Sequence, residues 1–384
     1  MDSLSPSPAC DPACQAARPT SSSKTLYSLQ ALRFIAAALV LVSHIRNEYG
    51  LSPFGSSGVD IFFVISGFII HYVTRDGAPQ FFVRRLIRIV PLYWLGTLAL
   101  AAVAIKAPSL LHQTSVDLPT LLASLFFIPV WNDTVQYHMP LLTLGWSLNY
   151  EILFYLVFFI AMKISHQHRL AISALLLLAL TSLHPYVATE SALAFWSDAY
   201  IVEFIYGMVL AQVLGVTRFT DRIHLPLAAC LAGLALYTWA LLPDTGLVTP
   251  QMALDKWLRI VVIGLPSTAL IILTLACEQS FRAFSPRSKS VVNFLGELSY
   301  PIYIFHIYVM GAMKRLGALG SSLPVYSVIV FAATLGVASA VYLLYEQPIR
   351  KLLSQHLLRK KGKDGHPPQN ALPLSPATHI GTGG

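Results

Sequence analysis

The chain has 384 residues, of which 55% are hydrophobic and 11% carry a charge, and its mean hydropathy is +0.63. Soluble domains average about a quarter charged residues, so this composition excludes an ordinary soluble protein and indicates a polytopic membrane protein. The formal net charge of +8 comes from basic residues in short clusters between apolar runs and near the C-terminal end, which is the pattern of topology signals and not of a nucleic-acid site.

The first 24 residues are rich in Ser, Pro and Ala, and no basic segment followed by an apolar one marks a cleavable signal peptide. We expect residues 1–24 to be a disordered leader, 25–350 to form one transmembrane domain without internal repeats, and 351–384 to be a basic and then disordered tail. The four cysteines suggest neither a zinc quartet nor a disulfide framework, and for Cys10 and Cys14 a metal or palmitoylation site is the alternative.

Ten apolar stretches are long enough, or nearly so, to cross a hydrocarbon core of about 30 Å. They are residues 27–46, 58–74, 91–105, 144–163, 169–185, 198–215, 225–242, 257–277, 297–313 and 324–345. With both termini cytoplasmic, the basic clusters after the even-numbered stretches fall inside, whereas Lys314 and Arg315 fall outside. The run 121–131 is too short to span and is interpreted as a re-entrant or outer interfacial helix. The predicted fold class is therefore an all-α polytopic membrane protein of about ten transmembrane helices plus this short helix.

The first stretch carries Arg33 and His44, eleven residues apart. On a helix, this spacing places both side chains on one face, about 16 Å apart along the axis. Such residues usually persist within a membrane only where they face a protein interior, a partner or water. The alternative is an arginine that snorkels to one surface and an interfacial histidine at the other. The predicted topology places Arg33 toward the cytoplasm and His44 near the outer surface.

Further charged residues follow along the second and third stretches. Asp60 lies near the outer end of the second stretch, at the depth of the first stretch's histidine. Arg84, Arg85 and Arg88 form a cytoplasmic cluster in which Arg84 and Arg88 share one helical face, and Pro91 is expected to open the third helix. Guanidinium groups bind phosphates through bidentate hydrogen bonds, so the cluster is a candidate phosphate site. A positive-inside anchor is the alternative interpretation.

Later stretches place more polar side chains at depth. Glu151 should lie about 10 Å below the outer face of the fourth stretch, where a carboxylate needs a partner. Tyr155 follows it one turn later, and His306 lies near the middle of the ninth stretch, one turn after Tyr303. A histidine hydrogen-bonded between helices is the alternative for His306.

Taken in order, these motifs resemble the membrane-bound acyltransferase family 3, which includes O-acetyltransferases of lipopolysaccharide, exopolysaccharide and nodulation factors. The resemblance spans about residues 27–350. It rests on residues 29–33 (LQALR) with His44, on 58–68 (GVDIFFVISGF), on Arg84, Arg85 and Arg88 with Pro91, on Trp146-Ser147-Leu148 with Glu151 and Tyr155, and on 299–303 (SYPIY) with His306.

The resemblance implies that an acyl group, usually acetyl, passes from acyl-CoA on the cytoplasmic side to a hydroxyl of a carbohydrate at the outer side of a bacterial inner membrane. The acceptor would be a polysaccharide, a lipid-linked glycan or a glycolipid, and neither a metal nor nucleic acid is expected. Arg33 and His44 carry the family's catalytic signature, with His44 as the base that takes the hydroxyl proton. Glu151 or Asp60 is expected to orient that imidazole.

The remaining site residues are assigned on the same basis. The arginine cluster is expected to attract the phosphates of CoA, with Arg33 deeper in the path. The expected donor-binding residues are Arg84, Arg85 and Arg88, and the expected substrate-binding residues are Trp146, Ser147, Tyr155, Tyr303 and His306.

Two other classes of function remain open at this point. A transporter or exporter of a small molecule or glycan intermediate also places charges near a central pathway, although inverted repeats and broken helix pairs are not visible here. A pH or small-molecule sensor would use His44 and His306 as titrating groups, although no signalling domain is visible.

Overall fold

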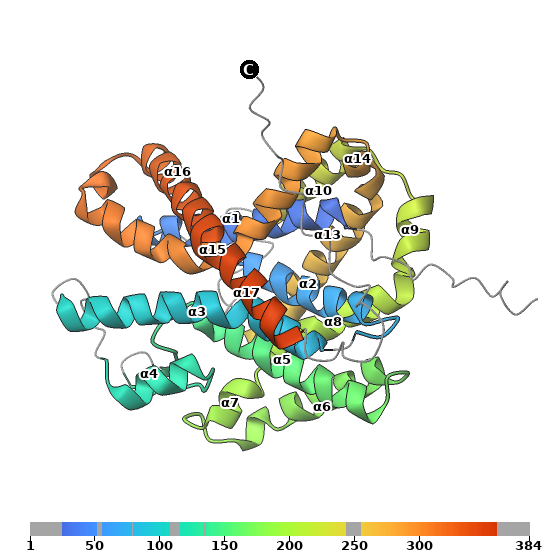
Figure 1. Ribbon diagram of the computed structural model, residues 1–384, viewed down its shortest axis with the longest axis horizontal. Helices are drawn as coiled ribbons and strands as arrows, with labels where there is room; N and C mark the ends of the chain where they lie inside the picture. Colours follow the sequence, from blue (N-terminus) through green and yellow to red (C-terminus); the bar gives the residue numbers. More distant parts are fainter. Residues whose placement is uncertain are drawn as a thin grey trace, which may run out of the picture. The chain divides into compact units, whose positions relative to one another are not determined.

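The computed structural model describes residues 25–51, 56–78, 80–107, 116–133, 136–242 and 255–358. Nearly all of them belong to one compact unit, Leu26–Lys360, and this unit is almost entirely helical (Figure 1). The predicted leader, with its two cysteines, and the tail beyond residue 358 lie outside the described residues.

The helices vary widely in length. In chain order, the elements are α1 (Tyr27–Glu48), α2 (Gly58–Val73), α3 (Phe81–Lys106), α4 (Leu118–Leu125), the strands β1 (Trp131–Asn132) and β2 (Tyr137–His138), α5 (Gly145–Ile164), α6 (Arg169–Ser182), η3 (His184–Tyr186), α7 (Ala192–Trp196), η4 (Ala199–Ile201), α8 (Val202–Leu214), α9 (Val216–Arg222), α10 (Leu227–Ala240), α12 (Lys256–Arg259), the π-helical η6 (Ile260–Gly264), α13 (Leu265–Ala276), α14 (Glu278–Arg282), α15 (Pro286–Arg315), η7 (Ala318–Gly320), α16 (Leu323–Val341), the π-helical η8 (Tyr342–Glu346) and α17 (Gln347–Leu358).

Seven helical segments in the described ranges are long and apolar enough to cross a membrane. They are Tyr27–Glu48, Phe81–Lys106, Gly145–Ile164, Arg169–Tyr186, Ala192–Leu214, Lys256–Ala276 and Leu323–Leu358. Helices α2 and α10 are apolar but shorter, and the 30-residue α15 covers the ninth predicted stretch. Helix α4 has 8 residues, about 12 Å of helix, which is too short to cross the membrane. The prediction of an all-helical polytopic membrane protein is confirmed, with one two-residue β-hairpin as the exception.

The third helix begins earlier than predicted. Pro91 does not open the third helix, because α3 begins ten residues earlier, at Phe81. Proline lacks the N–H that would bond four residues back. Tyrosine hydroxyls from neighbouring helices bond carbonyls in this part of α3: Tyr300 donates to Ile89 at 2.7 Å and Tyr345 to Pro91 at 3.2 Å. The helical path after α16 also continues to the end of α17, so the predicted domain boundary at residue 350 falls within a helix.

The two ends of the bundle are defined by contacts between distant segments. We call the end where α1 begins the N face and the end where α1 finishes the opposite face. At the N face, the backbone N–H of Ser28 donates to Glu278 at 2.9 Å. At the opposite face, Lys314 pairs with Glu48 at 2.7 Å. If successive membrane helices alternate in direction, the start of α1 and α14 fall on one side of the membrane. The ends of α1 and α15 fall on the other side, so both contacts agree with this topology.

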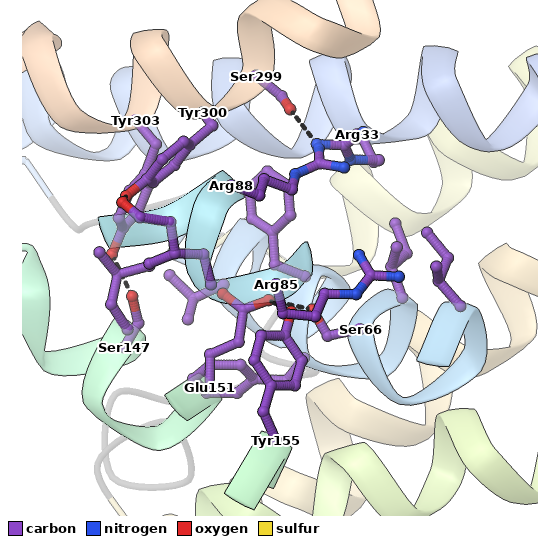
Figure 2. Close-up of a pocket in the computed structure, with 17 residues that line it drawn as sticks. Arg33, Ser66, Arg85, Arg88, Ser147, Glu151, Tyr155, Ser299, Tyr300 and Tyr303 are labelled. Atoms are coloured by element: carbon purple, nitrogen blue, oxygen red, sulfur yellow. Dashed lines mark hydrogen bonds between the residues drawn. The ribbon is translucent and has the colours of Figure 1, made fainter. Parts of the chain in front are cut away.

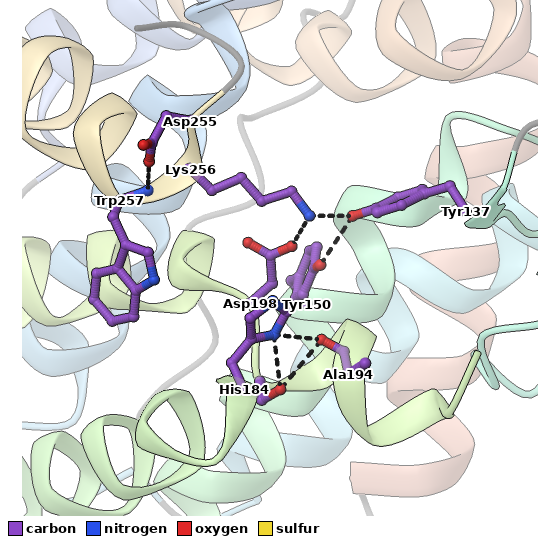
Figure 3. Close-up of polar contacts among 9 residues, drawn as sticks. Tyr137, Tyr150, His184, Ala194, Asp198, Asp255, Lys256 and Trp257 are labelled. Atoms are coloured by element: carbon purple, nitrogen blue, oxygen red, sulfur yellow. Dashed lines mark hydrogen bonds and ion pairs between the residues drawn. The ribbon is translucent and has the colours of Figure 1, made fainter. Parts of the chain in front are cut away.

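A second cluster joins three segments at the opposite face. Figure 3 shows the ammonium group of Lys256, at the start of α12, between Asp198 and Tyr137. Asp198 precedes η4 and Tyr137 belongs to β2, so residues from three widely separated segments meet. Lys256 also lies 4.6 Å from the centre of the Tyr137 ring, a cation–π contact. The cluster therefore fixes the β-hairpin against the ends of two membrane helices.

Helices α2 and α8 pack closely along their lengths, and α1 lies against both α2 and α15. Gly67 of α2 lies against the backbone of Phe204, and Gly207 of α8 lies against the backbone of Val64. A Cβ at either glycine would overlap a backbone carbonyl of the other helix. These small residues permit close approach of the two helices, and thereby fix the position of α2, which lines the site described next.

Candidate active site

A cavity lies between five helices, α1, α2, α3, α5 and α15 (Figure 2). Its volume is about 90 Å³. One water needs roughly 10–15 Å³, so the cavity has room for several waters or for part of a ligand. Along α2 it extends from Val59 to Ile69, ten residues or about 15 Å, which is half the thickness of a hydrocarbon core. Its lining residues are Arg33, Val59, Phe62, Phe63, Ile65, Ser66, Ile69, Arg85, Arg88, Ile89, Ser147, Leu148, Glu151, Tyr155, Ser299, Tyr300 and Tyr303.

Arg33 is the arginine that α1 contributes to the cavity lining. Its side chain is 8% exposed, and its guanidinium donates to Gln30 Oε1 at 2.8 Å and to Ser299 Oγ at 3.0 Å. Gln30 in turn donates to Asn293 at 2.9 Å. The arginine therefore faces the protein interior, and the alternative of a snorkelling side chain does not fit this geometry.

The arginines of α3 contribute unequally. Arg85 and Arg88 line the cavity, whereas Arg84 does not. Arg84 and Arg88 do lie one turn apart on α3, as expected, but only Arg88 of the two lines the cavity. Residues three apart also share a helical face, and packing of α3 turns the Arg85/Arg88 face inward. With Arg33, the lining carries three positive charges against one negative charge, that of Glu151, so the net formal charge of +2 suits an anionic ligand.

Glu151 lies in the cavity but does not contact His44. Its Oε1 accepts a hydrogen bond from Ser66 at 2.7 Å and another from Tyr155. Arg85 lies 5.9 Å from the centre of the Tyr155 ring. The carboxylate thus has the partner that its depth requires, supplied by hydroxyls from α2 and α5.

A hydrogen-bonded group forms the end of the cavity toward the opposite face. The hydroxyl of Tyr303 donates to the Leu144 carbonyl at 2.9 Å. It also lies 2.6 Å from Ser147 Oγ (Figure 2). These bonds join α15 to the first turn of α5. The cavity therefore ends at a latch between two helices, which we call the Tyr303 latch.

His44 lies beyond this latch and does not line the cavity. It is half-buried, and its ring centre lies 4.9 Å from that of His306. The spacing of eleven residues therefore does not bring Arg33 and His44 into one cavity, because His44 lies against His306 beyond the latch. His306, expected to bind substrate, also lies outside the lining, one turn after Tyr303.

Asp60 also lies away from His44. Both of its carboxylate oxygens accept hydrogen bonds from Arg259, at 2.9 and 2.5 Å. Asp60 is 0% exposed, as is the neighbouring Glu203. A buried bidentate pair of this kind holds α2 to α12, so the expectation that Asp60 orients His44 does not fit the structure.

Trp146 is part of an aromatic cluster beside the cavity and does not line it. Its ring lies 5.3 Å from Tyr200 and 6.2 Å from Phe63. Of the residues expected to bind substrate, the structure brings Ser147, Tyr155 and Tyr303 into the cavity.

Sequence reasoning missed several polar residues near the site. Glu297 accepts a hydrogen bond from Arg350 at 2.7 Å and lies within electrostatic range of Arg33 and Arg88. It and Arg259 each fall at the start of an apolar stretch, and a charge in that position was the signal that could have identified them. Ser66 gave no signal, since a small residue in a membrane helix is explained by packing alone. In the described ranges, no group of three His, Cys, Asp or Glu side chains could hold a metal ion.

Comparison with known proteins identifies the family. A family model described as an acyltransferase domain matches residues 26–343. Exopolysaccharide production protein ExoZ of Rhizobium meliloti (strain 1021) is 32% identical over 302 residues, covering 77% of this chain and 89% of ExoZ. No solved structure matches the chain significantly.

Two more distant relatives carry an enzymatic name. O-acetyltransferase OatA of Staphylococcus aureus (strain NCTC 8325) is 26% identical over 360 residues, covering 86% of this chain and 58% of OatA. The putative peptidoglycan O-acetyltransferase YrhL of Bacillus subtilis (strain 168) is 26% identical over 362 residues, covering 84% and 54%. The chain thus spans little more than half the length of these two proteins. Since the matched residues 26–343 include every helix that lines the cavity, the chain belongs to the acyltransferase 3 family and is a polytopic membrane acyltransferase.

Proposed function

We propose that this protein is an O-acyltransferase that moves an acyl group, acetyl as the first candidate, from cytoplasmic acyl-CoA to a hydroxyl of a surface or exported carbohydrate. The observation that carries the proposal is the cavity, which is lined by arginines toward the N face and ends at the Tyr303 latch. From the latch, His306 is one helical turn away. The cavity thus leads from a cationic end to the histidine pair across about half a membrane thickness.

The proposal takes the N face as cytoplasmic. Basic residues are concentrated at the connections on this face, as the positive-inside rule expects. They include Arg75, Arg84, Arg85, Arg88, Lys163, Arg218, Arg222, Arg282, Arg287, Lys289, Arg350 and Lys351. Acyl-CoA is made and used in the cytoplasm, so this orientation places the cationic end of the cavity toward the donor, in the inner membrane of a bacterium.

The donor's charge distribution fits the cavity. CoA carries several phosphate negative charges, and Arg85 and Arg88 present guanidinium groups that bind phosphate oxygens in pairs. The uncharged pantetheine arm would extend past Ser66 and Glu151 toward the latch. Arg33, held by Ser299, would then stabilise negative charge deep in the cavity.

In the proposed reaction, the acceptor hydroxyl oxygen attacks the thioester carbonyl while His44 takes the hydroxyl proton. The carbon–sulfur bond breaks, and the proton passes from His44 to the leaving thiolate, so that acyl-CoA and an alcohol give an ester and free CoA. Opening of the Tyr303 latch would bring the thioester to His44. Glu151 contributes through its bonds to Ser66 and Tyr155, which shape the donor path, and not through His44.

The acceptor side is the opposite face. A carbohydrate is proposed because ExoZ is named for exopolysaccharide production and YrhL for a putative action on peptidoglycan. Trp146 lies with Ser147 in the first turn of α5 at this face, so we place it near the acceptor path as part of the wall.

The test is CoA release by purified protein in lipid nanodiscs supplied with acetyl-CoA and extracted surface polysaccharide. We expect acetyl-CoA consumption that depends on the polysaccharide and a new acetyl ester on the glycan by mass spectrometry. The His44→Ala protein should lose at least about 10²-fold in turnover while keeping its unfolding temperature. Transport of the glycan across a vesicle membrane in the absence of acetyl-CoA, with no CoA release when acetyl-CoA is present, would instead identify an exporter.

A further inference from the structure

The hydrogen bonding of His306, which lies against His44, determines which of its two ring nitrogens carries the proton. His306 is 0% exposed, and its Nδ1 lies 3.1 Å from the carbonyl oxygen of Ile302. A carbonyl oxygen only accepts hydrogen bonds, so Nδ1 carries the ring proton. In a neutral imidazole, the other nitrogen, Nε2, is then an acceptor with a free lone pair.

That acceptor has no donor in the part of the chain that the structure describes. Buried polar groups are almost always hydrogen-bonded, and an exception in a native structure needs an explanation. The ring facing His306 is that of His44, at 4.9 Å between centres and tilted by 50°. The centre of the Tyr303 ring lies 6.3 Å from that of His306.

The group positioned to orient the His44 ring is His306, and not a carboxylate. Glu48, one turn later on α1, acts on it electrostatically and pairs with Lys314 from α15 at 2.7 Å. Among the described residues, no carboxylate hydrogen-bonds to His44. A histidine acting as a base requires a group that fixes which nitrogen carries the proton and where the other points.

We propose that His306 is the positioning residue for His44: its Nε2 accepts the N–H of His44 when substrates are bound, which leaves the second nitrogen of His44 as the base. The inference rests on the proposed function. Catalytic hydrogen bonds are often longer in free enzymes and shorten in the reacting complex, so the present ring separation is the starting geometry. In the proposed complex it is the His44 ring that rotates, because the His306 ring is held by the Ile302 carbonyl.

The proton balance is simple. His44 takes the acceptor hydroxyl's proton at its free nitrogen and becomes an imidazolium whose other N–H remains bonded to His306. The same proton then passes to the sulfur of CoA as the carbon–sulfur bond breaks. His306 keeps its own Nδ1 proton throughout and does not change its charge.

Two substitutions separate positioning from packing. Glutamine can place its amide oxygen where Nε2 lies, whereas asparagine is one carbon shorter and cannot reach His44. In the nanodisc assay with acetyl-CoA, His306→Gln should retain kcat within about 10-fold of the original protein. His306→Asn should lose about 10²-fold in kcat with little change in KM for acetyl-CoA, since orientation of a base acts on the chemical step. His306→Met is similar in volume but has no strong acceptor, and it should behave like His306→Asn, whose acceptor does not reach His44.

The outcomes divide cleanly. Equal kcat in folded His306→Gln, His306→Asn and His306→Met proteins, whether all active or all inactive, overturns the positioning role. In a His44→Ala background, the same substitutions should add little further loss, because they act through the missing ring. Additive losses in that background would also overturn it. Absence of CoA release by the unsubstituted protein contradicts the proposed function instead, and is thereby distinguishable.

Discussion

Breaking the Asp60–Arg259 pair tests the difference between the sequence-based and structural assignments of Asp60. The pair joins α2 to α12 through two hydrogen bonds, at 2.9 and 2.5 Å, and both side chains are almost fully buried. The change Asp60→Asn keeps the shape and removes the charge, and Arg259→Met keeps most of the volume. A catalytic carboxylate and a structural one respond differently to the first substitution.

The magnitude follows from what each change leaves behind. Removing one partner of a buried ion pair costs about 3–5 kcal/mol, because the other charge remains buried without compensation. Arg259→Met leaves two buried carboxylates, Asp60 and Glu203, both 0% exposed, so we expect the upper end of this range. Asp60→Asn leaves Arg259 next to Glu203 and an amide, so we expect the lower end.

The measurement is the unfolding temperature of the purified variants in one detergent, together with CoA release per folded molecule. Losses of this size correspond to roughly 4–6 °C in a protein of this length. The double variant should cost less than the sum of the two single changes, since both remove the same interaction. Folded Asp60→Asn should keep its turnover within about threefold. A variant with unchanged stability and turnover reduced by about 10²-fold or more would refute the structural assignment and restore Asp60 as a partner of the base.

Three further predictions concern the donor path and the helix packing. Arg85→Gln should weaken acetyl-CoA binding, and the affinity of the original protein should fall with added salt. Arg84→Gln, outside the cavity, is the control, and equal losses of affinity in isothermal titration would contradict the assignment of the cavity. Tyr303→Phe removes the latch hydroxyl and should change kcat more than KM for acetyl-CoA; unchanged kcat would show that the latch does not limit transfer. Gly207→Ala should destabilise the protein by about 1–3 kcal/mol through overpacking. Gly311→Ala, whose added Cβ meets nothing within 4 Å, should not lower the unfolding temperature, since alanine favours a helix over glycine. Equal shifts in the two variants would contradict the close backbone contact between α2 and α8.

The sequence by itself determined the fold class and the residues worth testing. Apolar runs of membrane length are a local property, so the helices follow from composition alone, and a charged or titratable residue inside such a run stands out at once. Arg33 and His44 were identified in this way, as was Glu151. Their side chains do have the interior surroundings that their depth requires, with Arg33 bonded to Ser299 across 266 residues.

Only the tertiary structure decided which of these residues meet. The rotation of α3 about its axis is set by packing against its neighbours, and it turns Arg85 and not Arg84 toward the cavity. The partner of Asp60 is Arg259, 199 residues away, and local sequence could mark both charges but not join them. His44 meets His306 and not a carboxylate because α1 lies against α15. The depth of a residue in the membrane follows from its position along one helix. The direction in which its side chain points, and the residue that it contacts, depend on how the other helices pack around that helix.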